Sequence, residues 1–265
     1  MLPPAPSLPV VMRKVGRQIE DVLLALGPGL AGNPAGIRMG SLLPDDRAYH
    51  EAVRRLEKKG VVAGIVPGKN AYLRLLPGPT LNCPPWLRPR REWSRRWRRV
   101  WYILTYDVPE KEANYRKNLK GFIERERFGQ FQRSVWVTFR DVRPLIQDLI
   151  DGAALLDFAM IFEARTALGI SDERIVDQAW NWPKIHAGQR WYLAAMEKVN
   201  GHLDRGEVPR EGLPDLLQEE MVAYRTAMVS DPLLPKALLP PEYLGQVVFK
   251  VHEAFLARWQ QLARA

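Results

Sequence analysis

Apolar and polar residues recur with the spacing of strands and helices through most of the chain, and the clearest stretch covers residues 99–140. Residues 100–106 are almost continuously apolar, which predicts a strand covered on both faces that ends before Pro109. The following residues predict an amphipathic helix, since large apolar side chains recur at helical spacing. They are Tyr115, Leu119, Phe122 and Ile123.

The stretch after this helix predicts the rest of one small sheet. Residues 130–139 alternate between apolar and polar types, as a strand does, and a bend would divide them into two strands. A short helix around residues 142–149 and an apolar strand at 159–162 follow. This order predicts a ferredoxin-like βαββαβ sheet.

The first 80 residues predict a winged helix-turn-helix. Helical patterns cover residues 15–26, 37–43 and 45–59. Two strands, at residues 61–66 and 71–75, then flank a Pro-Gly-Lys-Asn turn. Three helices and a hairpin in this order are the elements of a winged helix-turn-helix.

The last third predicts helices. Ser171 begins a capped helix, and a late apolar stripe is formed by Val248, Val251, Phe255, Trp259 and Leu262. The proline-rich residues 231–245 cannot be helical throughout. The predicted fold class is therefore α+β in four parts. They are a winged helix-turn-helix DNA-binding domain (1–80), an Arg/Trp-rich linker (81–99), a ferredoxin-like dimerisation domain (100–170) and a helical C-terminal domain (171–265).

Charge is unevenly distributed along the chain. Residues 1–99 hold 18 Lys and Arg against 7 Asp and Glu (+11), and residues 100–265 hold 21 against 23 (−2). A basic first third predicts a polyanion partner, because neutralised phosphates release condensed counterions. No apolar stretch approaches the roughly 20 residues that span a bilayer. With the single cysteine Cys83 and no export signal, we expect a cytoplasmic, nucleoid-associated protein with no membrane partner.

The predicted third helix is the candidate reader of double-stranded DNA. Arg47, His50 and Arg54 would meet base edges in the major groove, and Lys58 and Lys69 would meet phosphates. The full set of expected DNA contacts is Arg47, His50, Arg54, Arg55, Lys58, Lys69, Arg95, Arg96, Arg98 and Arg99.

The linker sequence WLRPRREWSRRWRR, residues 86–99, holds seven arginines, three tryptophans and one acid. Interleaved arginines and tryptophans could grip a nucleic-acid backbone, stack on exposed bases or form cation-π pairs against a neighbouring domain. Alternatively, the tryptophans belong to the core and the arginines extend to water. These interpretations all stay open at the level of sequence.

Two further groups of residues are candidate sites. No common metalloenzyme, nucleophile or P-loop motif is present, so Asp107 at a predicted strand end is the one candidate catalytic residue and metal ligand. It is either a helix N-cap or a Mg²⁺ ligand that needs a second copy from a dimer.

An aromatic and basic group could line an effector pocket or simply be core: Trp180, Trp182, Arg190 and Trp191.

The residues YDVPE at 106–110, FG at 128–129 and QRSVWV at 132–137 resemble the central domain of PaaX-type phenylacetate-catabolism repressors. The proline-rich residues 231–245 are similar to that family's C-terminal region. The resemblance implies a homodimeric bacterial repressor of a palindromic operator, with a central sheet related to the small CRISPR adaptation nuclease. It also implies release from DNA by an aryl-acyl-CoA effector such as phenylacetyl-CoA.

Two alternative functions remain at this stage. The relation to the CRISPR adaptation nuclease implies that Asp107 could hold a metal across a dimer. The chain could instead be a non-catalytic component of a defence complex that holds single strands with its Arg/Trp segment.

Overall fold

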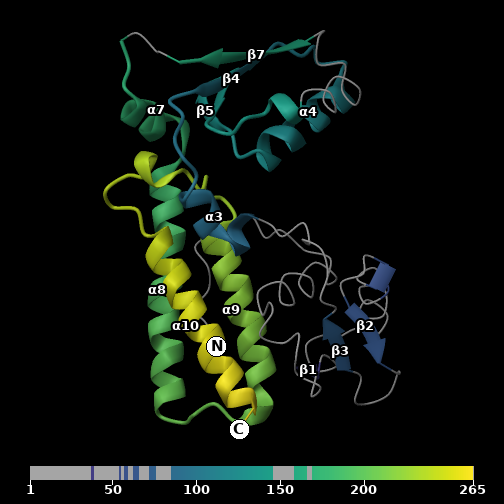
Figure 1. The fold of residues 1–265 in the computed structure, drawn as a ribbon, viewed down its shortest axis with the longest axis vertical. Helices are drawn as coiled ribbons and strands as arrows, with labels where there is room; N and C mark the ends of the chain where they lie inside the picture. Colours follow the sequence, from purple (N-terminus) through teal and green to yellow (C-terminus); the bar gives the residue numbers. More distant parts are fainter. Residues whose placement is uncertain are drawn as a thin grey trace. The chain divides into compact units, whose positions relative to one another are not determined.

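The structure is a computed structural model that describes residues 37–38, 54, 57–58, 62–65, 72–75, 85–145, 158–165 and 169–264 (Figure 1). The chain divides into two compact units. We call residues 90–184 with 232–243 the sheet unit, and residues 1–89 with 185–231 and 244–265 the bundle unit.

The sheet unit contains a four-stranded antiparallel sheet with the strand order β5-β6-β4-β7. Its elements follow the predicted order: β4 (Trp101–Tyr106), α4 (Ala113–Arg125), β5 (Gly129–Gln132), β6 (Val135–Thr138) and β7 (Ala159–Ala164). The predicted bend is confirmed, since residues 130–139 contribute to two strands. Of the second predicted helix, the described part forms the 3₁₀ turn η3 (Arg143–Leu145), and residues 146–149 lie outside the described residues. The chain is thus α+β with a small antiparallel sheet.

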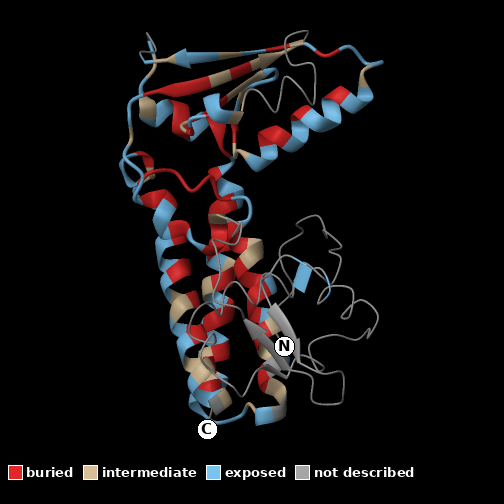
Figure 2. Cartoon of the chain, turned by 45° about the vertical axis from the view of Figure 1, so that its right-hand side comes forward, coloured by how far each residue is buried: buried red, intermediate tan, exposed pale blue. Residues whose placement is uncertain are grey.

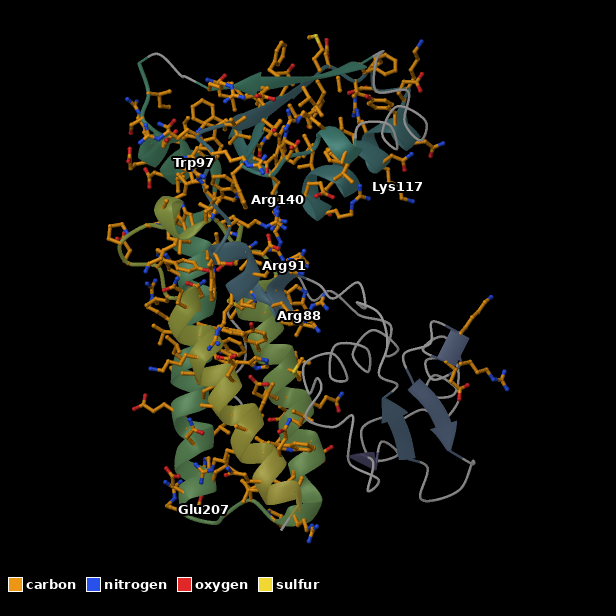
Figure 3. The ribbon with its side chains drawn as sticks, in the orientation of Figure 1. Arg88, Arg91, Trp97, Lys117, Arg140 and Glu207 are labelled. Carbon is orange, nitrogen blue, oxygen red and sulfur yellow. The ribbon has the colours of Figure 1, made fainter. Side chains whose placement is uncertain are left out.

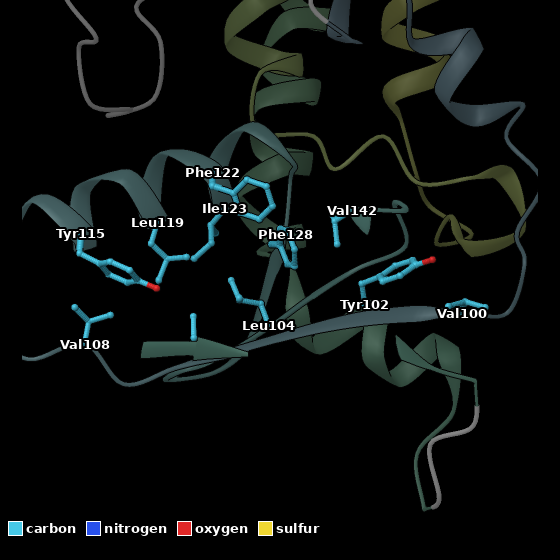
Figure 4. Close-up of a cluster of buried hydrophobic side chains, with 11 residues drawn as sticks. Val100, Tyr102, Leu104, Val108, Tyr115, Leu119, Phe122, Ile123, Phe128 and Val142 are labelled. Atoms are coloured by element: carbon cyan, nitrogen blue, oxygen red, sulfur yellow. The ribbon is translucent and has the colours of Figure 1, made fainter. Parts of the chain in front are cut away.

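Helix α4 forms the hydrophobic core of this unit with one face of the sheet (Figure 4). All four apolar residues predicted for its inner stripe are buried. Burying each side chain of this size contributes about 1.5–3 kcal/mol, so the stripe holds the helix against the strands. The cluster consists of Val100, Tyr102, Leu104, Val108, Tyr115, Leu119, Phe122, Ile123, Phe128, Val142 and Ala159.

The opposite sheet face is covered at Trp101 and Val137, which are buried, and only partly covered beyond them, so the prediction of a strand covered on both faces holds in part. Ile103 and Thr105 of β4 point away from the core cluster and are half-buried. They pair in register with Phe162 and Met160 of the edge strand β7, whose side chains are 49% and 62% exposed. An apolar strip therefore lies open along this edge.

Helix α7 (Asp172–Ala179) begins at the predicted cap, where the Ser171 hydroxyl accepts the Arg174 N–H at 3.3 Å. Its last residue and Trp180 lie directly against Gly129 of β5. A side chain larger than hydrogen at position 129 would collide with both, which explains the glycine there.

The bundle unit contains three long helices: α8 (Trp182–Asp204), α9 (Leu213–Met228) and α10 (Gly245–Arg264), with α8 starting in the sheet unit (Figure 1). The turn η4 (Arg210–Gly212) precedes α9, and η5 (Lys236–Leu238) interrupts the proline-rich stretch, which is not helical throughout, as predicted. Buried residues line the faces that the helices turn toward one another (Figure 2). The predicted stripe of α10 holds at Val248, Phe255 and Trp259, whereas Leu262 is exposed.

The described N-terminal residues form a separate three-stranded antiparallel sheet with the order β1-β3-β2. The predicted hairpin is confirmed by β2 (Val62–Ile65) and β3 (Tyr72–Leu75). The predicted helix at residues 37–43 is wrong at its start, since Ile37–Arg38 form β1 and pair with β3. The helix at 15–26 lies outside the described residues.

Candidate nucleic-acid interface

The tryptophans of residues 86–99 are largely structural. Trp86, in the turn η2 (Pro85–Leu87), is buried in the bundle unit, where its carbonyl accepts the Tyr224 hydroxyl at 2.8 Å. Trp93, in α3 (Pro89–Trp93), is buried in the sheet unit and donates its indole N–H to the Tyr243 hydroxyl at 3.0 Å. Neither ring is available for stacking on a base, so the core interpretation holds for these two residues.

Trp97 is half-buried and is held from two sides. Its ring centroid lies 4.9 Å from that of Trp101. The Asp172 carboxylate accepts the indole N–H of Trp101 at 2.8 Å and that of Trp97 at 3.4 Å. Two indoles on one carboxylate fix the path of the chain into β4.

Glu92, the one acid of the segment, is buried and holds a second anchor. Its carboxylate lies 2.8 Å from the guanidinium of Arg140, which is also buried, and 2.9 Å from that of Arg95. Burial is the main cause that lowers the pKa of Arg140, and the charge of Glu92 opposes it. Because Arg95 is turned to this carboxylate, it is a weaker candidate for a phosphate than its neighbours.

The remaining arginines of the segment are exposed. Within the part of the chain that the structure describes, no partner binds the guanidinium of Arg91, Arg96, Arg98 or Arg99. Arg88, in the bundle unit, is exposed in the same way. Arg99 also has a left-handed backbone, with φ of 56°, directly before the buried Val100. Figure 3 shows Arg91 on α3 and Trp97 beside α7.

This arrangement separates the two residue types of the segment. Tryptophans and Glu92 attach it to the fold, and arginines carry positive charge outward. A guanidinium presents a planar fork of donors that matches phosphate oxygens. The segment can therefore bind phosphates without rearranging its core contacts.

The predicted reading helix is described at three positions. Arg54 and Lys58 are helical and exposed, as predicted, and their spacing of four residues places them on one helix face. Arg47, His50, Arg55 and Lys69 lie outside the described residues. The assignment of all six to DNA therefore stays a prediction.

Asp107 is not a helix cap, so that interpretation is wrong. Helix α4 begins only at Ala113, with Glu112 as its N-cap residue. Pro109 starts a turn instead, in which its carbonyl accepts the Glu112 N–H at 3.1 Å. Asp107 is exposed at the end of β4, and among the described residues nothing binds its carboxylate. The same residues contain no group of three acids, histidines or cysteines that could hold a metal.

The proposed effector residues are divided between the two units. Trp180 and Trp182 are buried in the sheet unit, and the Trp182 indole donates to the Val176 carbonyl at 2.9 Å. Arg190 and Trp191 belong to the bundle unit, the former exposed and the latter half-buried. The effector assignment stays a prediction.

A buried polar cluster in the bundle unit was missed by sequence reasoning. Glu220 accepts the Tyr192 hydroxyl at 2.6 Å, and its same oxygen lies 2.8 Å from His252 Nδ1. The His252 ring stacks on Tyr224 with centroids 3.7 Å apart. Burial, followed by the charge of Glu220, raises the pKa of Tyr192 well above its usual value. Glu220 lies between Leu217 and Tyr224 on an apolar stripe, which was the available signal.

The helices of the described residues are too short or too polar to cross a membrane.

Comparisons with known proteins match two successive parts of the chain to one family. Residues 94–176 match the PaaX protein central Cas2-like domain, and residues 180–265 match the PaaX-like protein C-terminal domain. No curated protein matches the chain. A solved structure, the uncharacterized protein Rv0674 from Mycobacterium tuberculosis, is similar with a TM-score of 0.52 and 18% identity. The alignment covers 95% of this chain and 97% of that one, and at this identity it shows the fold alone. Because two PaaX domains in succession account for most of its length, the chain belongs to the PaaX family.

Proposed function

We propose that the protein is a homodimeric transcriptional repressor that binds a palindromic operator in double-stranded DNA. The observation that carries this proposal is the concentration of positive charge in the first 99 residues of a PaaX-family chain, +11 against −2 for the rest. A surplus of this size supplies sequence-independent affinity for a polyanion.

A winged helix-turn-helix at the N-terminus fits the described residues. In that fold a strand that lies between helices joins the hairpin to form a small sheet. The order β1-β3-β2, in which Ile37 and Arg38 pair with Leu73 and Tyr72, has this form. The exposed Arg54 and Lys58 then lie on the helix just before the hairpin, where a recognition helix belongs.

The exposed apolar residues of β7 support a dimer. A palindromic operator is read by two copies with a twofold axis. Met160 and Phe162 expose large apolar side chains on the edge strand β7, and the half-buried Ile103 continues this face. A second copy that packs here would bury them and shield the open edge.

The proposal includes a small-molecule effector that lowers the affinity of the repressor for DNA. Membership of the PaaX family supports an aryl-acyl-CoA such as phenylacetyl-CoA as the ligand. Adding it should lower the affinity of the wild-type protein for duplex DNA, while free coenzyme A at the same concentration should not.

The test of DNA binding is an equilibrium titration of random-sequence duplex at low ionic strength. Arg54→Ala with Lys58→Ala should weaken binding and reduce the slope of log K against log salt by about 0.9 for each phosphate that the variant no longer neutralises. Glu57→Ala, at an exposed helical position of the same segment, is the control and should not weaken binding. No binding by the wild type, or equal effects of basic and acidic substitutions, would refute the proposal.

A metal-dependent nuclease is the second candidate, favoured by one observation. Asp107 is exposed at a strand end of a Cas2-like domain and has no partner among the described residues. One carboxylate is too few for a Mg²⁺ site, so a partner subunit would have to supply the other. Mg²⁺-dependent cleavage that is abolished in Asp107→Asn, with DNA affinity unchanged, would support it. Absent or unaffected cleavage would eliminate it.

A further inference from the structure

We propose that Arg91, Arg96, Arg98 and Arg99 form a second DNA contact in the sheet unit, a preformed phosphate-binding surface that grips a duplex backbone without reading its sequence. We call these four residues the arginine surface. The inference rests on the proposed function, since it concerns the same DNA, but it assigns a contact to a domain other than the winged helix.

The first argument is that the positive charges of these arginines have no acidic partner among the described residues. The four arginines lie within nine residues, all are exposed, and the described residues offer none of them a partner. Two acids of this region are already engaged. Glu92 is buried between Arg95 and Arg140, and Asp172 accepts two indole N–H groups. The four charges therefore have no counter-charge among the described residues, and an external anion would supply one.

The second argument is that the segment is held in place before it binds. Trp93 is fixed by Tyr243, Trp97 by Trp101 and Asp172, and Glu92 by Arg140. These attachments leave the backbone between them little freedom, so binding need not order a loose linker. Preorganisation of this kind reduces the entropic cost of association.

The third argument selects the phosphate backbone of a duplex over bases of a single strand. Single-strand platforms combine positive charge with aromatic faces on which successive bases stack. Here Trp86 and Trp93 are buried, and Trp97 is half-buried against Trp101. The arginines are exposed and the aromatic rings are largely buried, so the segment is suited to contacts with phosphate oxygens rather than with bases.

The experiment measures how the affinity of the full-length protein for random-sequence duplex depends on salt. The variant is Arg91→Ala with Arg96→Ala and Arg98→Ala; Arg99 is kept because of its left-handed backbone. Each phosphate that the variant no longer neutralises should reduce the slope of log K against log salt by about 0.9, so the slope of the triple variant should fall by about 2–3.

The matched control removes three other cations of the same unit that are exposed and have no partner among the described residues. It combines Lys117→Ala, Arg174→Ala and Lys184→Ala and changes the net charge equally. Its slope should stay closer to that of the wild type. If both triple variants have the same melting temperature as the wild type, the contacts of Trp93, Trp97 and Glu92 that hold the segment are intact.

Five outcomes would overturn the inference. An unchanged slope in the arginine variant, or an equal reduction in the control, would remove the surface while the proposed function stands. Tighter binding of single strands than of duplex, abolished by Trp97→Ala, would make the segment a stacking platform. Displacement of duplex from the wild type by free coenzyme A would make it a site for a small phosphate ligand. If the wild type binds no duplex at all, the proposed function falls as well.

Discussion

Glu92 and Arg140 form a buried ion pair, with a carboxylate oxygen 2.8 Å from a guanidinium nitrogen and both side chains no more than 10% exposed. The pair joins α3 to the residue that follows β6 by two positions. It therefore links the Arg/Trp segment to the sheet, and the arginine surface depends on it for its position.

Glu92→Ala should destabilise the protein by about 3–5 kcal/mol, because Arg140 would remain buried without a counter-charge. Arg95→Ala is the control, since Arg95 contacts the same carboxylate but is 44% exposed, and it should change stability by at most about 1 kcal/mol. Urea denaturation of both variants measures the difference. Similar values for the two would show that the buried pair does not anchor the segment.

Gly129→Ala should destabilise the sheet unit by about 1–3 kcal/mol, since overpacking forces its neighbours to move. A Cβ atom there would lie 2.6 Å from the Trp180 ring and 2.7 Å from Ala179 Cβ. Gly121, in the middle of α4, has nothing within 4 Å of the same position. Gly121→Ala should instead stabilise by about 1 kcal/mol. Thermal melts show whether each substitution raises or lowers stability. A Gly129→Ala variant as stable as the wild type would contradict the packing of α7 on β5.

Phe162→Lys combined with Met160→Lys should convert the proposed dimer to a monomer, because two charges on the β7 face cannot be buried without partners. Each residue is exposed in the single chain, so the fold itself should change by no more than about 0.5 kcal/mol per site. Val222→Lys changes a similarly exposed apolar residue of α9 and should leave the assembly intact. Sedimentation velocity distinguishes the species; a dimer that survives the double substitution would place the interface elsewhere.

The Asp141 carboxylate should titrate with a pKa of about 2 rather than its usual 3.8, mainly because Arg143 donates hydrogen bonds to it at 2.6 and 2.9 Å. A lowered pKa means that the pair contributes stability above about 3.8, and that this contribution disappears as pH falls toward about 2. Carboxyl chemical shifts followed by NMR give the value directly. Arg143→Gln should return it toward 3.8, and a wild-type pKa near 3.8 would contradict the geometry.

The sheet unit could be predicted from sequence wherever one residue pattern had one structural solution. The helical spacing of Tyr115, Leu119 and Phe122 fits only an amphipathic helix, and all three are buried on α4. Asp107 misled because an acid before a proline suits both a cap and a turn. In the structure a turn begins at Pro109, and helix α4 therefore starts only at Ala113, too far along the chain for Asp107 to cap it.

Contacts between segments that are distant along the chain could not be predicted from the sequence. Glu220 and His252 could each be noticed as polar residues on apolar stripes, but their pairing depends on how α9 and α10 pack. The open face of β7 was equally hidden, because its sequence AMIFEA is apolar on both sides and does not tell which side is covered. In residues 86–99 the sequence left open whether the tryptophans belong to the core or stack on bases, and the burial of Trp86 and Trp93 assigns these two to the core.

The most direct test of the central claim is to select bound sequences from a pool of random duplex DNA with the wild-type protein at low ionic strength. A repressor dimer predicts a motif with twofold symmetry, whose half-sites are separated by about one helical turn or a multiple of it. A selected pool without any symmetric motif, or no retention of duplex DNA, would contradict the account.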